Sequence, residues 1–273
     1  MKVINAKKVS DLVARLCIQA NTILRADVLA ALKKAYAQEK NKKVKDALRA
    51  IIDNAAIAKR ERLAICQDTG LPCVFVELGQ DVRMSGDLME AINKGVELGY
   101  KKGYFRDSII KDPLERGKSG FSPALIHIDL VRGSKLKISV LPKGFGCENK
   151  SQLKMFNPTV SLDEIKKFIV GVVKNAGPDA CPPYVVGVGI GGTADYAGTL
   201  AKKALLRKVN TTKVKKLEND LLKEINKLNI GTMGLGGVTC LGVNIETAPT
   251  HIAGLPVAVN ISCHALRSAS AEI

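Results

Sequence analysis

The sequence predicts an α+β fold, because helical and strand-like patterns occur in separate stretches of the chain. Apolar residues recur at spacings of three and four over the first sixty positions, the pattern of amphipathic helices. Short apolar stretches bounded by glycine and polar residues follow, as expected for strands. We therefore expect a helical, bundle-like region at about residues 1–60, then mixed strands and helices, all in one domain of residues 1–273.

The first half of the chain supplies most of the expected helices. The start of the chain has the pattern of an amphipathic helix, and Ser10 is a candidate N-cap. Polar and turn residues over 64–72 interrupt the helical pattern and predict a tight loop. The expected elements of this half are helices at about 10–23, 26–37, 44–57 and 86–103, and a strand at 73–78.

The second half mixes strands and helices. Gly133 lies between two strand patterns, at 124–131 and 135–141, and predicts that they form a hairpin. Ser161 and Glu164 have the capping-box spacing that begins a helix. The other expected elements are strands at about 184–190, 242–245 and 256–264, and a helical stretch to about 228 that divides near Asn210.

The charge balance indicates an anionic partner or substrate. Lys and Arg number 42 against 26 Asp and Glu, a net charge of +16, which suits a polyanion or small anions. Aromatic residues make up only 4% and Trp is absent, which is poor for stacking on bases. A basic module that binds RNA or another polyanion is therefore the alternative function from a class other than enzymes. The lysine-rich stretch 201–227 is interpreted as a solvated helical face.

Targeting and membrane signals are not evident in the sequence. The first residues lack the apolar core and cleavage site of a signal peptide, and no apolar run reaches the roughly 18 residues of a membrane span. We expect a cytoplasmic protein with reduced thiols and without a membrane segment.

A glycine-rich strand, residues 187–192, fits the pattern GxGxxG. A dinucleotide site also needs an acidic residue about 20 positions further on, but none occurs between Asp195 and Glu218. The pattern therefore favours a strand packed tightly under a neighbouring backbone.

The seven cysteines fall into two groups. Cys17, Cys73 and Cys240 lie in apolar segments and are expected in the core. The other four, Cys66, Cys147, Cys181 and Cys263, lie in loop-like sequence. There is no CxxC pair, so a metal site would need ligands from distant loops.

Five segments together carry a family resemblance: 66–70 (CQDTG), 106–108 (RDS), 144–151 (GFGCENKS), 180–184 (ACPPY) and 249–251 (PTH) ahead of Ser262 and Cys263. In these segments the chain closely resembles the class I, iron-sulfur-dependent fumarate hydratases and the related tartrate dehydratases. It is most similar to their alpha subunits, from about residue 10 to the last residue.

The resemblance implies a 4Fe-4S cluster held by Cys66, Cys181 and Cys263, with one iron open to substrate. An open coordination position lets a metal act as a Lewis acid. Cys147 is expected to line the site without being a ligand.

The resemblance also implies the substrate contacts. Asp68 is the candidate catalytic residue, for proton transfer at the substrate hydroxyl. The residues expected to bind substrate are Gln67, Asp68, Arg106, Gly144, Gly146 and His251.

The expected activity is reversible hydration of fumarate to (S)-malate, and L(+)-tartrate dehydration is the alternative. Single-chain relatives have a further C-terminal domain that supplies the carbon base, whereas this sequence ends at Ile273. The resemblance therefore implies a separate beta subunit in an α2β2 assembly, with no nucleic-acid partner.

Overall fold

The computed structural model describes residues 2–209 and 216–273. Helices and mixed sheets both occur, so the expected α+β class is confirmed. The chain divides into two compact units. Unit 1 comprises residues 1–25, 55–145 and 267–273, and unit 2 comprises residues 26–54 and 146–266. Within the two described ranges, none of the helices has the length and apolar character needed to cross a bilayer.

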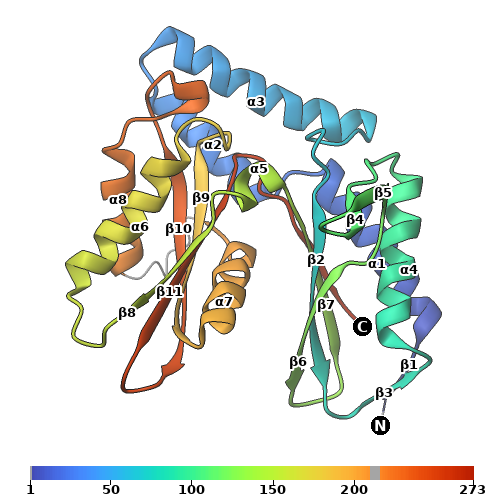
Figure 1. Ribbon diagram of the computed structural model, residues 1–273. Coiled ribbons are helices and arrows are strands. Elements are labelled where there is room, and N and C mark those ends of the chain that lie inside the picture. Colours follow the sequence, from blue (N-terminus) through green and yellow to red (C-terminus); the bar gives the residue numbers. More distant parts are fainter. Residues whose placement is uncertain (1, 210–215) are drawn as a thin grey trace. The chain divides into compact units, whose positions relative to one another are not determined.

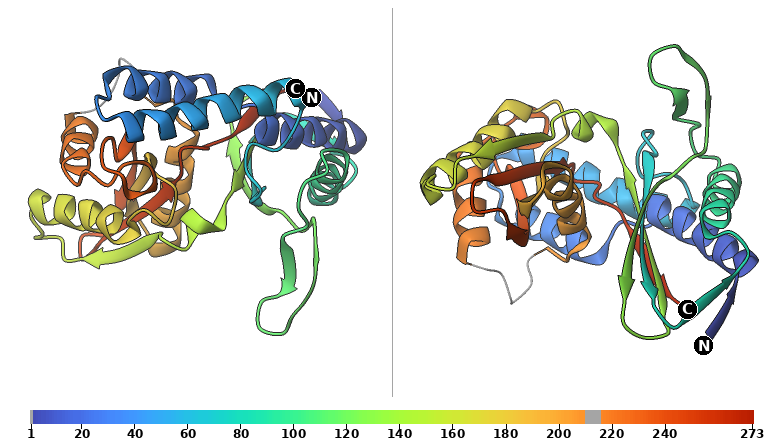
Figure 2. Two further views of the ribbon diagram at one scale, coloured as in Figure 1. Left: turned by 90° about the horizontal axis from the view of Figure 1, so that it is seen from above. Right: turned by 60° about the horizontal axis from the view of Figure 1, so that its bottom comes forward.

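Unit 1 is a four-stranded sheet with two helices on one face (Figure 1). Its helices and strands are β1 (Lys2–Asn5), α1 (Ala6–Thr22), β2 (Leu71–Gly79), β3 (Val82–Ser85), α4 (Leu88–Lys102), β4 (Ile109–Asp112), β5 (Arg116–Gly120), β6 (Leu125–Val131), β7 (Leu136–Lys143) and β12 (Ala269–Glu272). The main sheet has the order β12-β7-β2-β6. Apolar side chains of α1 and α4 pack on Val74, Val76 and Ile138 of this sheet. The β4–β5 hairpin extends away from the sheet (Figure 2).

The predicted hairpin between the strands at 124–131 and 135–141 is wrong. β6 and β7 do not pair with each other, because β2 lies between them, parallel to β6 and antiparallel to β7. The turn that contains Gly133 is instead held by the end of β2. The Asp81 N–H donates to the Gly133 carbonyl at 3.0 Å, and the Gln80 N–H donates to the Val131 carbonyl at 2.8 Å.

The beginning of the chain also differs from the prediction. Residues 2–5 form β1, a strand parallel to β3, and α1 begins only at Ala6. Asn5 is the N-cap, since its side chain accepts a hydrogen bond from the Lys7 N–H at 2.7 Å. Ser10, the predicted cap, lies inside α1 and is buried.

Unit 2 is a second four-stranded sheet with helices on both faces (Figure 1). Its helices and strands are α2 (Ala26–Gln38), β8 (Gln152–Phe156), α6 (Leu162–Ala176), β9 (Tyr184–Gly192), α7 (Ala194–Leu206), α8 (Lys216–Asn226), the 3-10 turn η1 (Thr232–Gly234), β10 (Cys240–Thr250) and β11 (Leu255–Ser262). The sheet order is β10-β9-β11-β8. Two further helices, α3 (Lys42–Glu61) and α5 (Phe145–Glu148), include residues of both units.

The elements of unit 2 follow the sequence pattern closely. Ser161 and Glu164 form the predicted capping box at the start of α6. Val186 and Val188 of β9 lie in the core that includes α6 and α8. The predicted division of the long helical stretch near Asn210 lies outside the described residues.

The glycines of β9 allow α7 to lie directly on the opposite face of the sheet. A Cβ atom at Gly187 would lie 2.1 Å from the Ala201 carbonyl oxygen, and one at Gly189 would lie 2.0 Å from that of Ala197. Both distances are far inside van der Waals contact, so the strand requires glycine at these positions. The GxGxxG pattern thus marks close backbone packing, as the sequence favoured.

Candidate functional site

Residues 66–70 form the loop that leads into β2 in unit 1. Thr69 is buried, and its hydroxyl oxygen accepts a hydrogen bond from the Arg106 N–H at 3.1 Å. The phenol of Tyr100, on α4, donates to the Thr69 carbonyl at 2.8 Å. Burial raises the pKa of this phenol far above its usual value, so the phenol stays protonated. The loop is therefore fixed to α4 and to the backbone at residue 106.

The carboxylate of Asp68 is held by backbone amides. One oxygen accepts from the Gly70 N–H at 3.0 Å and the other accepts from the Phe145 N–H at 2.8 Å. A Cβ atom at Gly144 would lie 3.1 Å from the second oxygen. Glycine at 144 therefore leaves room for the Asp68 carboxylate, a role that the sequence analysis did not foresee.

Gln67 and Arg106 present unengaged side chains beside this loop. Both residues are exposed, and neither side chain has a hydrogen bond or ion pair within residues 2–209 and 216–273. A planar guanidinium with its donors unused suits bidentate contact with a carboxylate. Around one loop of unit 1, the structure therefore brings together four of the predicted substrate residues, namely Gln67, Asp68, Arg106 and Gly144.

Gly146 differs from Gly144. A Cβ atom there would meet no atom within 4 Å, so the packing of the chain does not require glycine at this position. Space beside the backbone is what the approach of a ligand to the amide would need.

Arg267 contacts the same loop, and sequence reasoning missed it. It is only 3% exposed, and one of its terminal nitrogens donates a hydrogen bond to the Asp68 carbonyl. Nothing in the sequence distinguishes this arginine from a surface arginine, because its burial depends on contacts with residues about 200 positions away.

Unit 2 holds the other two predicted cluster ligands on loops that touch each other. The His264 N–H, next to Cys263, donates to the Cys181 carbonyl at 3.2 Å, and the His264 Nδ1 lies 3.1 Å from the same oxygen. Cys181 is exposed, with φ of 59°, and Cys263 is half-buried. The structure therefore brings the loops of Cys181 and Cys263 together at one end of the sheet.

Cys147 is more buried than expected for a residue that lines a site. It is 5% exposed and belongs to the core of unit 2. Its thiol donates to the carbonyl of Ala180 at 3.2 Å, one residue before Cys181. The Cys147 side chain thus contacts the loop of Cys181 from the core of unit 2.

The thiols fit a site with three cysteine ligands. All seven cysteines lie in the described residues, and none forms a disulfide. Cys17, Cys73, Cys147 and Cys240 are buried, whereas Cys66, Cys181 and Cys263 reach the surface at least partly. Burial raises the pKa of the Cys17 and Cys240 thiols to about 12, which disfavours the thiolate that a metal requires.

No preformed metal centre is present in the described residues, since no group of three or more His, Cys, Asp or Glu side chains is arranged to hold a metal ion. Cys66 belongs to unit 1, whereas Cys181 and Cys263 belong to unit 2. The fit of these residues to a cluster therefore rests on the chemistry of the three accessible thiols.

His251 is not brought to the two cysteine loops of its own unit. It lies in the turn between β10 and β11, where its Nδ1 accepts from the Ala253 N–H at 3.1 Å. Thr250 pairs with Gly192 at one end of the sheet, while Ser262 pairs with Val185 near the other end. The length of β11 therefore separates His251 from Cys263.

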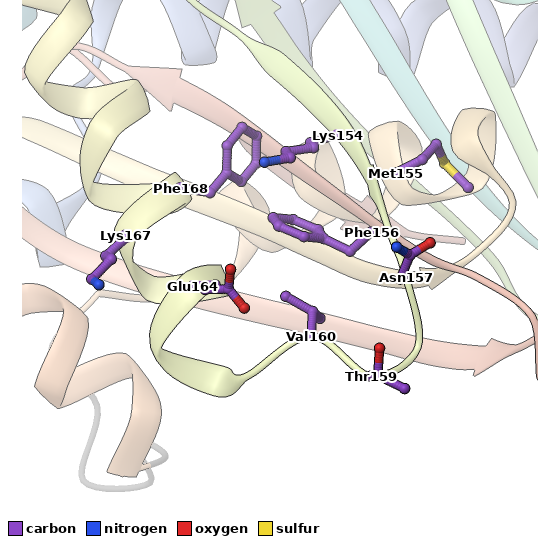
Figure 3. Close-up of a pocket in the computed structure, with 9 residues that line it drawn as sticks. All are labelled: Lys154, Met155, Phe156, Asn157, Thr159, Val160, Glu164, Lys167 and Phe168. Carbon is purple, nitrogen blue, oxygen red and sulfur yellow. The ribbon is translucent and has the colours of Figure 1, made fainter.

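A pocket of about 650 Å³ in unit 2 contains none of the predicted site residues (Figure 3). It lies between β8 and the start of α6, and Lys154 stands 4.6 Å from the centre of the Phe156 ring. Its lining residues are Lys154, Met155, Phe156, Asn157, Thr159, Val160, Glu164, Lys167 and Phe168.

Comparison with known proteins agrees with the pattern of these loops. The family model described as fumarate hydratase (Fumerase) matches residues 10–272. The chain is 41% identical over 279 residues to "Putative L(+)-tartrate dehydratase subunit alpha" of Methanocaldococcus jannaschii, with 97% of this chain and 98% of that protein covered. It is 30% identical over 275 residues to L(+)-tartrate dehydratase subunit alpha of Escherichia coli strain UTI89, with 97% and 91% covered. The chain therefore belongs to the fumarate hydratase (Fumerase) family and, within it, to the alpha subunits.

Proposed function

We propose that this chain is the cluster-bearing alpha subunit of an iron-sulfur hydro-lyase that adds water to, or removes it from, a four-carbon dicarboxylate. The observation that carries the proposal is the grouping of Gln67, Asp68 and Arg106 around the loop that begins with Cys66. An amide, a carboxylate and a guanidinium beside a thiolate ligand are the groups that such a reaction needs.

Cys66, Cys181 and Cys263 are the proposed ligands of a 4Fe-4S cluster. When bound, the cluster would supply a Lewis-acidic iron with one position open to the hydroxyl and a carboxylate of the substrate. The remaining functions fall to the side chains and backbone of the chain itself.

Asp68 is the proposed proton carrier at the substrate hydroxyl. Hydrogen bonds from the Gly70 and Phe145 amides fix the direction of the carboxylate. The unengaged guanidinium of Arg106 would bind one substrate carboxylate, and Gln67 would orient the substrate by hydrogen bonding. The open space at Gly146 would let its amide approach the same anion.

A separate beta subunit is the proposed partner. The relatives are named as alpha subunits, and these names support a second kind of chain in the active enzyme. That chain would supply the carbon base and further carboxylate contacts, within an α2β2 assembly that we expect in the cytoplasm.

The fumarate and (S)-malate pair is one proposed substrate, and L(+)-tartrate is the second. The family description favours the first and the names of the relatives favour the second. Because tartrate carries one more hydroxyl than malate, contacts to that hydroxyl would separate the two activities.

Anaerobic co-purification with the beta subunit tests the proposal. We expect a coloured protein that contains iron and sulfide and interconverts fumarate and malate or dehydrates L(+)-tartrate. An iron-free protein after reconstitution, with strongly salt-dependent nucleic-acid binding, would instead support a polyanion-binding module. Loss of water from tartrate without hydration of fumarate would assign the second substrate.

A further inference from the structure

Arg267 is a buried cation of unit 1. One terminal nitrogen donates to the Asp68 carbonyl, but the buried Nε has no hydrogen-bond partner within residues 2–209 and 216–273. Within the part of the chain that the structure describes, no carboxylate forms an ion pair with this guanidinium.

The neighbouring groups do not form an ion pair with this guanidinium. Both oxygens of the Asp68 carboxylate are engaged by the backbone amides of Gly70 and Phe145. Tyr100 is close enough to respond to the charge of Arg267, but burial keeps its phenol neutral. Among the described residues, the guanidinium beside the loop of Cys66 therefore has no direct ion-pair partner.

An unpaired buried charge destabilises a folded protein unless another group compensates it. A methylene-rich side chain could fill the same space without this penalty. The fold thus retains a guanidinium where packing alone would favour an apolar residue, and this points to an anion that binds nearby.

We propose that Arg267 is a positioning residue that fixes the Cys66 to Gly70 loop through the Asp68 carbonyl and supplies the positive charge that retains the anionic cluster at Cys66. This inference rests on the proposed function. Three thiolates and the sulfides of a cluster carry net negative charge together, and a cation in a low-dielectric surrounding stabilises such a charge strongly.

The test uses the full chain with Arg267→Gln and Arg267→Lys, and with Arg132→Gln as the control. Arg132 is an exposed arginine of the same unit, so its substitution makes an equal change in net charge. Two quantities are measured: thermal unfolding of the cluster-free chain, and anaerobic release of iron from the reconstituted chain to a chelator.

We expect the cluster-free Arg267→Gln variant to unfold at a temperature no lower than the native chain, since it loses a buried charge that has no ion pair and keeps an N–H donor. Once reconstituted, the same variant should release iron about tenfold faster than the native chain. Arg267→Lys should restore most of the retention, and Arg132→Gln should change neither quantity.

Two results would overturn the inference. If Arg267→Gln lowers the unfolding temperature of the cluster-free chain or prevents folding, and Arg267→Lys does the same, the arginine has a structural role only. If iron release is unchanged and, in the enzyme assembled with its beta subunit, KM for the dicarboxylate rises instead, the anion that pairs with Arg267 is the substrate. If the native chain does not bind iron, the proposed function is rejected. The unfolding temperatures of the cluster-free variants still show whether Arg267 has a structural role.

Discussion

The hydroxyl oxygen of Thr69 accepts the backbone N–H of Arg106 at 3.1 Å across 37 positions of sequence. This hydrogen bond links the loop of the proposed ligand Cys66 to the proposed carboxylate-binding arginine. The position of the guanidinium relative to Asp68 therefore depends on a residue that itself would not touch substrate.

Substitution of Thr69 tests this dependence. Thr69→Val keeps the shape of the side chain but leaves the Arg106 N–H unpaired, which should lower the free energy of unfolding by about 1–3 kcal/mol. In the enzyme assembled with its beta subunit, KM for the dicarboxylate should rise more than kcat falls. Thr69→Ser, which keeps the hydroxyl, is the matched control. Equal kinetics of the Val and native proteins would contradict the coupling.

The two glycines of the 144–151 loop give a matched pair of substitutions. Gly144→Ala places a methyl group 3.1 Å from the Asp68 carboxylate, so we expect a displaced carboxylate and a fall in kcat of about 10²-fold or more. Gly146→Ala meets no atom within 4 Å, so its unfolding temperature should equal that of the native protein. If Gly146→Ala nevertheless raises KM, the open space at 146 serves the substrate. Unchanged kcat in Gly144→Ala would exclude the proposed role of Asp68.

Cys147 and the ligand cysteines should respond differently to serine. Cys147→Ser keeps a donor for the Ala180 carbonyl, which now accepts from the thiol at 3.2 Å, so the variant should retain its iron. Cys147→Ala loses that donor and should retain less. Cys66→Ser, Cys181→Ser and Cys263→Ser should each lose the cluster, as measured by iron and sulfide content. Iron loss in Cys147→Ser together with retention in Cys263→Ser would reverse the assignment.

Sequence patterns predicted those features that depend on local chemistry. The capping box at Ser161 and Glu164 begins α6 as expected. The sequence lacks the acidic residue that a dinucleotide site requires, and this correctly favoured close packing of the β9 glycines against α7. These predictions succeeded because the decisive contacts lie within a few residues or one strand-helix unit.

Long-range pairing was the part that the sequence did not reveal. Gly133 has the form of a hairpin turn, yet β2 lies between the two flanking strands, and its residues pair with β6 residues 52 positions later, as Gly79 does with Val131. The burial of Arg267 was not predicted either, because the sequence alone does not distinguish a buried arginine from an exposed one. Only the tertiary structure shows its contact with the Asp68 carbonyl.

The rate at which each of the seven cysteines is alkylated should follow its burial, with accessible thiols reacting faster than buried ones. A thiol with a pKa of about 12, such as those of Cys17 and Cys240, is thiolate at pH 8 in only about one molecule in 10⁴. The cluster-free native chain should therefore be alkylated quickly at Cys66, Cys181 and Cys263, and at all seven cysteines after denaturation. Mass spectrometry of the labelled peptides identifies the sites. Labelling of Cys17 as fast as Cys181 would show that the core of unit 1 opens readily.

His251 and Cys263 lie at opposite ends of β11. At about 3.3 Å per residue, the eight residues of this strand span roughly 26 Å, which is beyond the reach of a histidine side chain. Substrate bound at the cysteine loops of one chain would therefore be too far from His251 of the same chain. A contact between His251 and substrate then requires a second copy of the chain.

Complementation between two inactive variants tests this requirement. His251→Ala and Cys181→Ser alpha subunits, each assembled with native beta subunit, should have little activity alone. Mixed assemblies that contain both variants should regain part of the native activity, because the intact cluster of the first chain meets His251 of the second. Co-expression with two different affinity tags isolates the mixed form. If the mixed form is as inactive as its parents while cluster content is retained, His251 does not act across copies, and its proposed role in substrate binding fails with it.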